Sequence, residues 1–186
     1  MRSLTDLAAP AMDYPELLPN TCDTHLSFID RIGPTEQKLR FLFMGAVFAT
    51  GSPRIWEQIA NLRETWLLDP GIVAYKPAKE VQQVLVDTKL PTAQFLCRVW
   101  WDNLRAIQAR FKGSFTLLVQ RCQQDALLIA RYFQKSEAMF PLLAEPAFSY
   151  RWLDYIHRKT SIPLRDWDKL TLPLPEDMPQ RTPGLG

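Results

Sequence analysis

The chain has 186 residues, of which 47% are hydrophobic and 23% are charged, and its formal net charge is +2. Such a chain can bury a substantial core as one domain, and its composition excludes an intrinsically disordered protein. Its densest apolar run, residues 41–50, is far shorter than the roughly 20 residues that a bilayer requires, so we expect no membrane span.

Prolines and small polar residues dominate the start of the chain, which predicts an irregular N-terminal arm over residues 1–33. Pro34 fits the first position of a helix that ends near Gly51. The apolar residues of this helix are so dense that we expect it to be deeply buried: Leu39, Phe41, Leu42, Phe43, Val47 and Phe48.

A second helix is predicted to start at Ser52-Pro53, where a hydroxyl cap is followed by a proline. Its apolar residues recur at helical spacing as far as Trp66. The turn-forming sequence Asp69-Pro70-Gly71 then interrupts the helical pattern, and Pro77 opens a further helix.

The longest predicted helix starts at Pro91 and runs to about Phe111. It is followed by Lys112-Gly113, which supplies a basic last turn and a stop. Ser114 and Asp125 are good N-caps for two further short helices.

Helix signals thus follow one another along the chain, and no segment carries a convincing strand pattern. The fold class that we predict is all-α, a compact array of about eight to ten short helices. The expected division is an arm over residues 1–33, a helical domain over residues 34–172 and a proline-rich tail over residues 173–186.

Positive charge is concentrated in residues 96–135, which hold seven Arg and Lys residues against two Asp residues. This excess of five positive charges is able to bind phosphate groups in a salt-sensitive way. The same residues are equally well explained as a solvated helix face whose arginine side chains shield apolar surface. The sequence alone leaves both interpretations open.

Cysteine and histidine are too few and too scattered to predict a metal site or a disulfide framework. The cysteines Cys22, Cys97 and Cys122 include no Cys-x-x-Cys pair, and the only histidines are His25 and His157. We therefore expect neither a metal nor another cofactor. Together with a start that carries an early acid and no apolar core, this cysteine usage predicts a cytoplasmic protein.

The sequence from Phe140 to Ile156 predicts a tight turn that leads into an amphipathic helix with Pro146 at its first position. The order and spacing of the residues in this segment resemble those of the helix-hairpin-helix DNA glycosylase superfamily, especially its 8-oxoguanine glycosylase/lyase branch. The later run from Leu172 to Thr182 shares this resemblance. A coarser resemblance covers about residues 35–182.

In that family the hairpin reads roughly Gly-Pro-Lys before a Trp-Leu helix, and an Ile-Pro-Val-Asp-x-His segment follows. Here Glu145 replaces the hairpin glycine and Ala147 replaces the lysine, whereas Asp177 matches the aspartate. The resemblance therefore implies a degenerate member of the family. It also implies a truncated one, because further helices normally follow the aspartate.

These replacements bear on the chemistry that the resemblance implies. Ala147 has no amine with which to form a Schiff base to the sugar, so lyase chemistry is not expected. Asp177 is the candidate catalytic residue, which in a monofunctional glycosylase would stabilise positive charge on the deoxyribose. Glu145 opposes phosphate binding at the hairpin unless it caps the helix that starts at Pro146, which is the role we expect.

The candidate DNA-binding residues belong mainly to the longest helix and its end: Arg98, Arg105, Arg110, Lys112 and Arg151. Three hypotheses for the function follow. The first is a non-catalytic or weakly active glycosylase-like protein, a DNA-binding or interaction subunit whose partner is double-stranded DNA or a protein. The second is a monofunctional DNA glycosylase that excises a damaged base with Asp177. The third is an unrelated helical protein-interaction module.

Overall fold

The computed structural model describes residues 27–48, 53–62, 66–90 and 93–170, and every regular element in these ranges is helical. Nine α-helices and two 3₁₀ helices form in the described residues, which confirms the predicted all-α array of short helices. None of these described helices is both long and apolar enough to span a bilayer. The elements are α1 (Ser27–Asp30), α2 (Thr35–Phe48), α3 (Pro53–Asn61), η3 (Trp66–Leu68), α4 (Pro70–Val73), α5 (Ala78–Asp87), α6 (Ala93–Phe111), α7 (Phe115–Arg121), α8 (Ala126–Lys135), α9 (Pro146–Lys159) and η4 (Trp167–Lys169).

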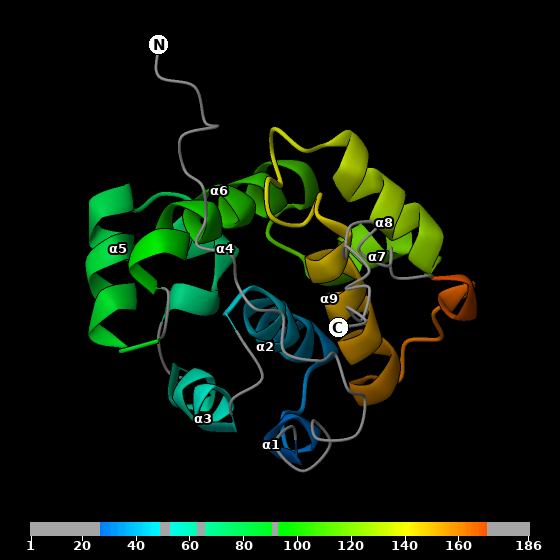
Figure 1. Ribbon diagram of the computed structural model, residues 1–186, viewed down its shortest axis with the longest axis horizontal. Helices are drawn as coiled ribbons and strands as arrows, with labels where there is room; N and C mark the ends of the chain where they lie inside the picture. Colours follow the sequence, from blue (N-terminus) through cyan, green and yellow to red (C-terminus); the bar gives the residue numbers. More distant parts are fainter. Residues whose placement is uncertain (1–26, 49–52, 63–65, 91–92, 171–186) are drawn as a thin grey trace, which may run out of the picture.

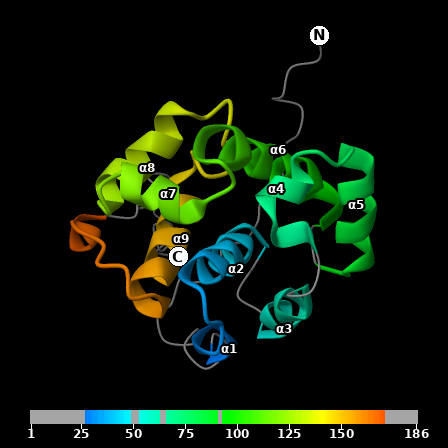
Figure 2. The same cartoon turned by 180° about the vertical axis from the view of Figure 1, so that it is seen from behind.

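Helix α2 lies at the centre of the molecule, with α4, α5 and α6 on one side and α7, α8 and α9 on the other (Figure 1 and Figure 2). It contacts α3, α6, α7 and α9. Every residue from Phe41 to Phe48 is buried, so this part of α2 has no solvated face. The density of its apolar residues predicts this burial correctly.

The ring of Phe43 on α2 joins the two sides of the molecule. Its centroid lies 5.7 Å from that of Trp100, 4.8 Å from that of Phe115 and 5.5 Å from that of Trp152. These three partners come from α6, α7 and α9. Aromatic pairs of this kind contribute about 0.5–1.5 kcal/mol each beyond the burial of their area, so the packing of α6, α7 and α9 is coupled through α2.

Short-range signals set several helix ends as predicted. The side chain of Ser114 accepts a hydrogen bond from the Leu117 amide over 3.0 Å, and that of Asp125 accepts one from the Leu128 amide over 2.9 Å. Helix α6 ends just before Lys112 and Gly113, whose φ angles are +52° and +77°. This left-handed backbone stops the helix, and glycine adopts it without strain.

The arm predicted over residues 1–33 is wrong in part, because its last residues form α1. Ile29 is fully buried, and the ring of Phe28 lies 5.9 Å from that of Phe41 in an edge contact. These two apolar side chains dock α1 on the core, which the prolines earlier in the arm do not indicate. The remainder of the arm, residues 1–26, lies outside the described residues.

The segment Asp69-Pro70-Gly71 begins helix α4 instead of interrupting the helical pattern. A side-chain oxygen of Asp69 accepts a hydrogen bond from the Gly71 amide over 2.8 Å, and Pro70 takes the first helical position. The sequence that favours a turn therefore also caps a short helix. The predicted helix end near Gly51, the cap at Ser52 and the tail from residue 173 lie outside the described residues.

Candidate nucleic-acid interface

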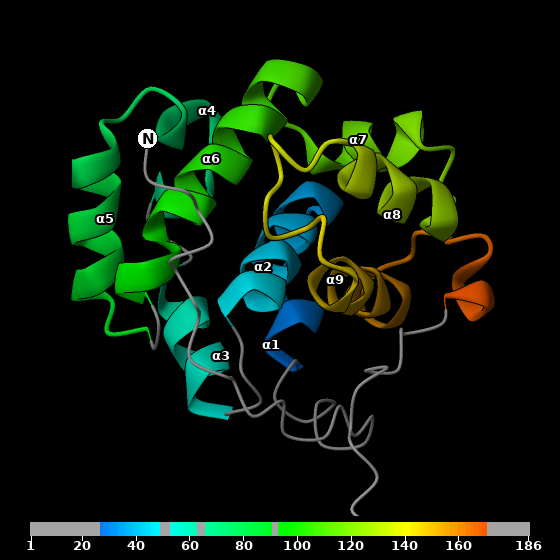
Figure 3. The same ribbon diagram turned by 45° about the horizontal axis from the view of Figure 1, so that its top comes forward.

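Six exposed cationic side chains lie along the C-terminal half of α6, the turn after it, α7 and α8, and we refer to them as the basic surface: Arg105, Arg110, Lys112, Arg121, Arg131 and Lys135. Helix α6 contacts α7, and Figure 3 shows α7 and α8 side by side near the end of α6. None of the six forms an ion pair with a carboxylate in the described part of the chain. Their charges are therefore available to neutralise phosphate groups.

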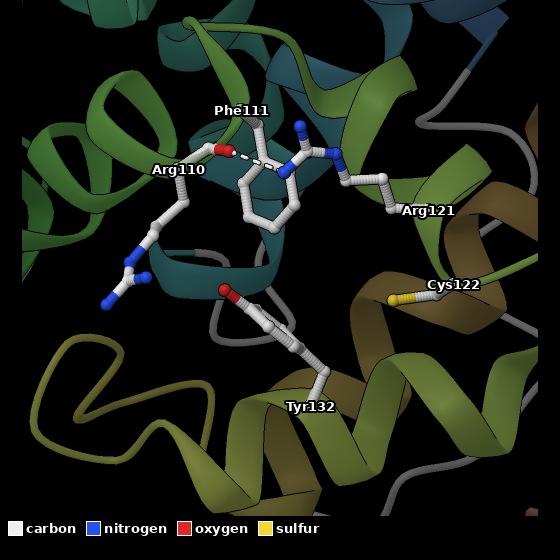
Figure 4. Close-up of a pocket in the computed structure, with 5 residues that line it drawn as sticks. All are labelled: Arg110, Phe111, Arg121, Cys122 and Tyr132. Atoms are coloured by element: carbon white, nitrogen blue, oxygen red, sulfur yellow. Dashed lines mark hydrogen bonds between the residues drawn. The ribbon is translucent and has the colours of Figure 1, made fainter.

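Arg121 and Arg110 are brought together across the α6–α7 turn. The guanidinium of Arg121 donates a hydrogen bond to the backbone carbonyl of Arg110 over 3.1 Å. It also lies 5.7 Å from the centroid of the Phe111 ring. Both contacts fix the Arg121 guanidinium at the end of α6, whereas the Arg110 guanidinium points away from it (Figure 4).

A pocket of about 290 Å³ opens beside this pair of arginines, between α6, α7 and α8 (Figure 4). The ring of Tyr132, from α8, makes an edge contact of 5.5 Å with the ring of Phe111. Burial, with a smaller effect of the Asp125 charge, raises the pKa of the Cys122 thiol, so this thiol is a weak nucleophile at neutral pH. The pocket is lined by Arg110, Phe111, Arg121, Cys122 and Tyr132.

Arg98 and Arg105 both lie against one tryptophan on the outer face of α6. Their guanidinium carbons are 4.6 and 4.4 Å from the ring centroid of Trp101. Trp101 is half-buried, and its indole donates a hydrogen bond to the Lys76 carbonyl over 3.0 Å. Arg98 also forms an ion pair of 2.9 Å with Asp102, so its charge is already balanced, whereas that of Arg105 is not.

Arg151 does not join the basic surface. Its guanidinium donates a hydrogen bond to the Ala46 carbonyl in α2 over 3.3 Å and lies 5.5 Å from the ring centroid of Phe148. The side chain therefore fastens α9 to α2. Of the five predicted DNA-binding residues, the structure brings Arg105, Arg110 and Lys112 into the basic surface, places Arg98 at its edge in an ion pair, and leaves Arg151 elsewhere.

Residues 136–145 connect α8 to α9. Pro146 takes the first position of α9, as predicted, and Glu145 is its N-cap residue. The carboxylate of Glu145 makes no capping hydrogen bond, so at this position it acts on α9 through its charge at the helix N-terminus. An exposed carboxylate at the N-terminus of α9 disfavours phosphate there.

The candidate catalytic residue Asp177 lies outside the described residues. Within the described ranges, no three His, Cys, Asp or Glu side chains are grouped so that they could hold a metal ion. Comparison of the chain with models of protein families, with curated proteins and with solved structures gave no match.

The sequence does not single out four residues that the structure adds, three of them to the basic surface and one, Tyr132, to the pocket beside it. Arg121, Arg131 and Lys135 were counted in the excess positive charge but not selected, because their lack of carboxylate partners depends on the fold. No pattern in the sequence points to Tyr132 as a pocket residue, because its position there depends on how α8 packs beside the end of α6.

Proposed function

We propose that this protein is a non-catalytic subunit with a helix-hairpin-helix glycosylase-like fold that binds double-stranded DNA through the basic surface. The observation that carries the proposal is the set of six exposed cations on α6, α7 and α8 that have no carboxylate partner in the described ranges. Cations of this kind release counterions when they contact the phosphate backbone, which favours binding. The family resemblance favours duplex DNA over other polyanions.

Two sequence features support the absence of catalysis. Ala147 stands where the family has its lysine, and Glu145 places a carboxylate where the family has a glycine.

Equilibrium binding to a short fluorescent duplex tests the proposal. The double variant Arg110→Glu/Arg131→Glu reverses two charges of the basic surface, and we expect it to weaken binding by roughly tenfold or more. The matched control is Lys79→Glu, which reverses an exposed charge on α5, outside the basic surface, and is expected to change the affinity less than about twofold. Absence of binding by the native protein, or an equal loss in the control, would reject the proposal.

A single-turnover assay tests the non-catalytic part separately. Duplexes that carry oxidised, deaminated or alkylated bases are incubated with the protein, and alkali then reveals any abasic site. We expect no cleavage of any duplex. Cleavage that disappears in Asp177→Asn would instead establish a monofunctional glycosylase and overturn this part of the proposal.

A further inference from the structure

The pocket between α6, α7 and α8 is lined by two aromatic rings that pack in or against the core and by two arginine side chains. We propose that it binds a nucleoside monophosphate unit, with the base against Tyr132 and the phosphate on Arg121. A volume of about 290 Å³ suits one small ligand, and it is too small for a duplex. The inference thus goes beyond the proposed binding of duplex DNA.

The aromatic side of the pocket offers a surface for a planar base. Phe111 is only 3% exposed and is fixed in the core, whereas Tyr132 is half-buried at the pocket. Their edge contact of 5.5 Å holds the two rings at an interplanar angle of 71°. Because Phe111 is almost fully covered, the base stacks on the exposed part of the Tyr132 ring.

The cationic side of the pocket is already organised for an anion. One Nη atom of Arg121 is engaged with the Arg110 carbonyl, and the other donor groups of its guanidinium remain available. Contact with the Phe111 ring further restricts the Arg121 side chain, so little freedom is lost when a phosphate binds. One acidic residue, Asp125, has a charge that acts on the pocket residue Cys122. Its carboxylate already accepts a hydrogen bond from the Leu128 amide.

The hydroxyl of Tyr132 supplies a polar group at the pocket. In Figure 4 it points toward the side chain of Arg110. It makes no hydrogen bond with any residue in the described part of the chain, so it can donate to a phosphate or accept from a base edge. The same chemistry is present in a free nucleotide and in the phosphorylated end of a DNA strand.

Calorimetric titration with AMP, GMP, adenosine and inorganic phosphate tests the proposal on the full chain. We expect each nucleotide to bind more tightly than adenosine or phosphate alone. Arg121→Gln and Tyr132→Leu are expected to weaken nucleotide binding about tenfold or more. The control is Lys79→Gln, which removes an exposed charge on α5, outside both the pocket lining and the basic surface, and is expected to change the affinity less than about twofold.

Amide chemical shifts of the native protein give a readout that does not depend on how well a variant folds. We expect AMP to shift the signals of residues 110–111, 121–122 and 132 most strongly. Tighter binding of a DNA strand with a 5′-phosphate than of the same strand with a 5′-hydroxyl would assign the source as a DNA end, and equal binding of the two strands would assign it as a free nucleotide.

Three results would overturn the proposal: no nucleotide binding by the folded native protein, unchanged binding in Arg121→Gln, or binding of phosphate alone as tight as that of AMP. Failure here is distinguishable from failure of the proposed function, because Tyr132→Leu removes no charge. We expect that variant to lose nucleotide binding and to keep its affinity for duplex DNA. Loss of both affinities in Tyr132→Leu would contradict a separate pocket.

Discussion

The guanidinium of Arg121 and the backbone carbonyl of Arg110 are joined by a hydrogen bond of 3.1 Å, although the two residues belong to different helices. The bond fixes a cation of α7 at the end of α6. Neither guanidinium is balanced by a carboxylate in the described ranges, so both charges are available to phosphate groups.

Arg105→Gln is expected to weaken duplex binding more than Arg98→Gln does. The Arg98 charge is balanced by Asp102 at 2.9 Å, whereas Arg105 has no such partner, so we expect a loss of roughly threefold or more for Arg105 and less than about twofold for Arg98. Fluorescence anisotropy at one fixed salt concentration measures both. Asp102→Asn serves as the converse variant, since it leaves the Arg98 charge unbalanced and should tighten binding. Equal losses in the two arginine variants would show that the ion pair is irrelevant.

Arg151→Gln is expected to change stability and to leave DNA binding intact. The variant loses the hydrogen bond to Ala46 and the contact with the Phe148 ring, which should lower the free energy of unfolding by about 1 kcal/mol. Urea denaturation measures this loss, and anisotropy should show an affinity within about twofold of the native protein. A variant with native stability and weakened DNA binding would place Arg151 in the interface after all.

Glu36, at the start of α2, organises the start of α7. Its carboxylate accepts hydrogen bonds from the Phe115 and Thr116 amides over 2.9 and 2.8 Å and from the Ser114 hydroxyl over 3.1 Å. Burial acts to raise the pKa of Glu36, but the hydrogen bonds from Thr116 and Phe115 and the charge of Arg40 outweigh it, so the pKa lies below its ordinary value. The resulting stability is fully present above the unfolded pKa, about 4.3, and is lost as the pH falls through the folded pKa.

Glu36→Gln is therefore expected to lower the free energy of unfolding at pH 7 by about 2 kcal/mol, the scale of hydrogen bonds to a charged group. The difference from the native protein should shrink as the pH falls below the unfolded pKa, because the native carboxyl then becomes neutral too. Urea denaturation over a pH series measures the difference. Glu80→Gln is the control, since Glu80 lies on the exposed face of α5 and its one ion pair within the described residues is with Lys76. A difference that stays constant with pH would exclude the charge of Glu36 as its cause.

Asn103→Leu is expected to stabilise the protein. The side chain of Asn103 is fully buried in α6, and neither its amide nitrogen nor its amide oxygen has a hydrogen-bond partner among the described residues. Replacement by an apolar side chain of similar size removes the unpaired polar group, which should raise the free energy of unfolding by about 1 kcal/mol. The midpoint of urea denaturation measures the change, with the exposed Asn61→Leu as a control expected to stay within about 0.5 kcal/mol. A fall in stability would mean that the amide is paired in solution.

Local signals in the sequence predict much of this fold, because they act over a few residues. The caps at Ser114 and Asp125 each bond an amide three residues later, and the stop at Lys112-Gly113 follows from the backbone of two adjacent residues. The local structure of Asp69-Pro70-Gly71 is harder to predict, because the same residues favour both a turn and a capped helix.

The candidate site is less predictable, because it depends on residues that are far apart in the chain. Spacing alone predicts that Arg98 pairs with Asp102 one helical turn later, a signal that sequence analysis overlooked. No local pattern places Tyr132 beside Phe111 or Glu36 beside Thr116, since these pairs arise from how the helices pack. Which Arg and Lys side chains lack a carboxylate partner likewise depends on where the fold places each Asp and Glu.

The salt dependence of duplex binding tests the central claim most directly. The affinities of the native protein and of Arg110→Gln/Arg131→Gln are measured over a series of salt concentrations, and the logarithm of the binding constant is plotted against that of the salt concentration. We expect a steep negative slope for the native protein, and a slope smaller in magnitude by roughly 2 for the double variant, since each phosphate contact contributes about 0.9. A slope near zero for the native protein, or the same slope for both proteins, would contradict DNA binding through the basic surface.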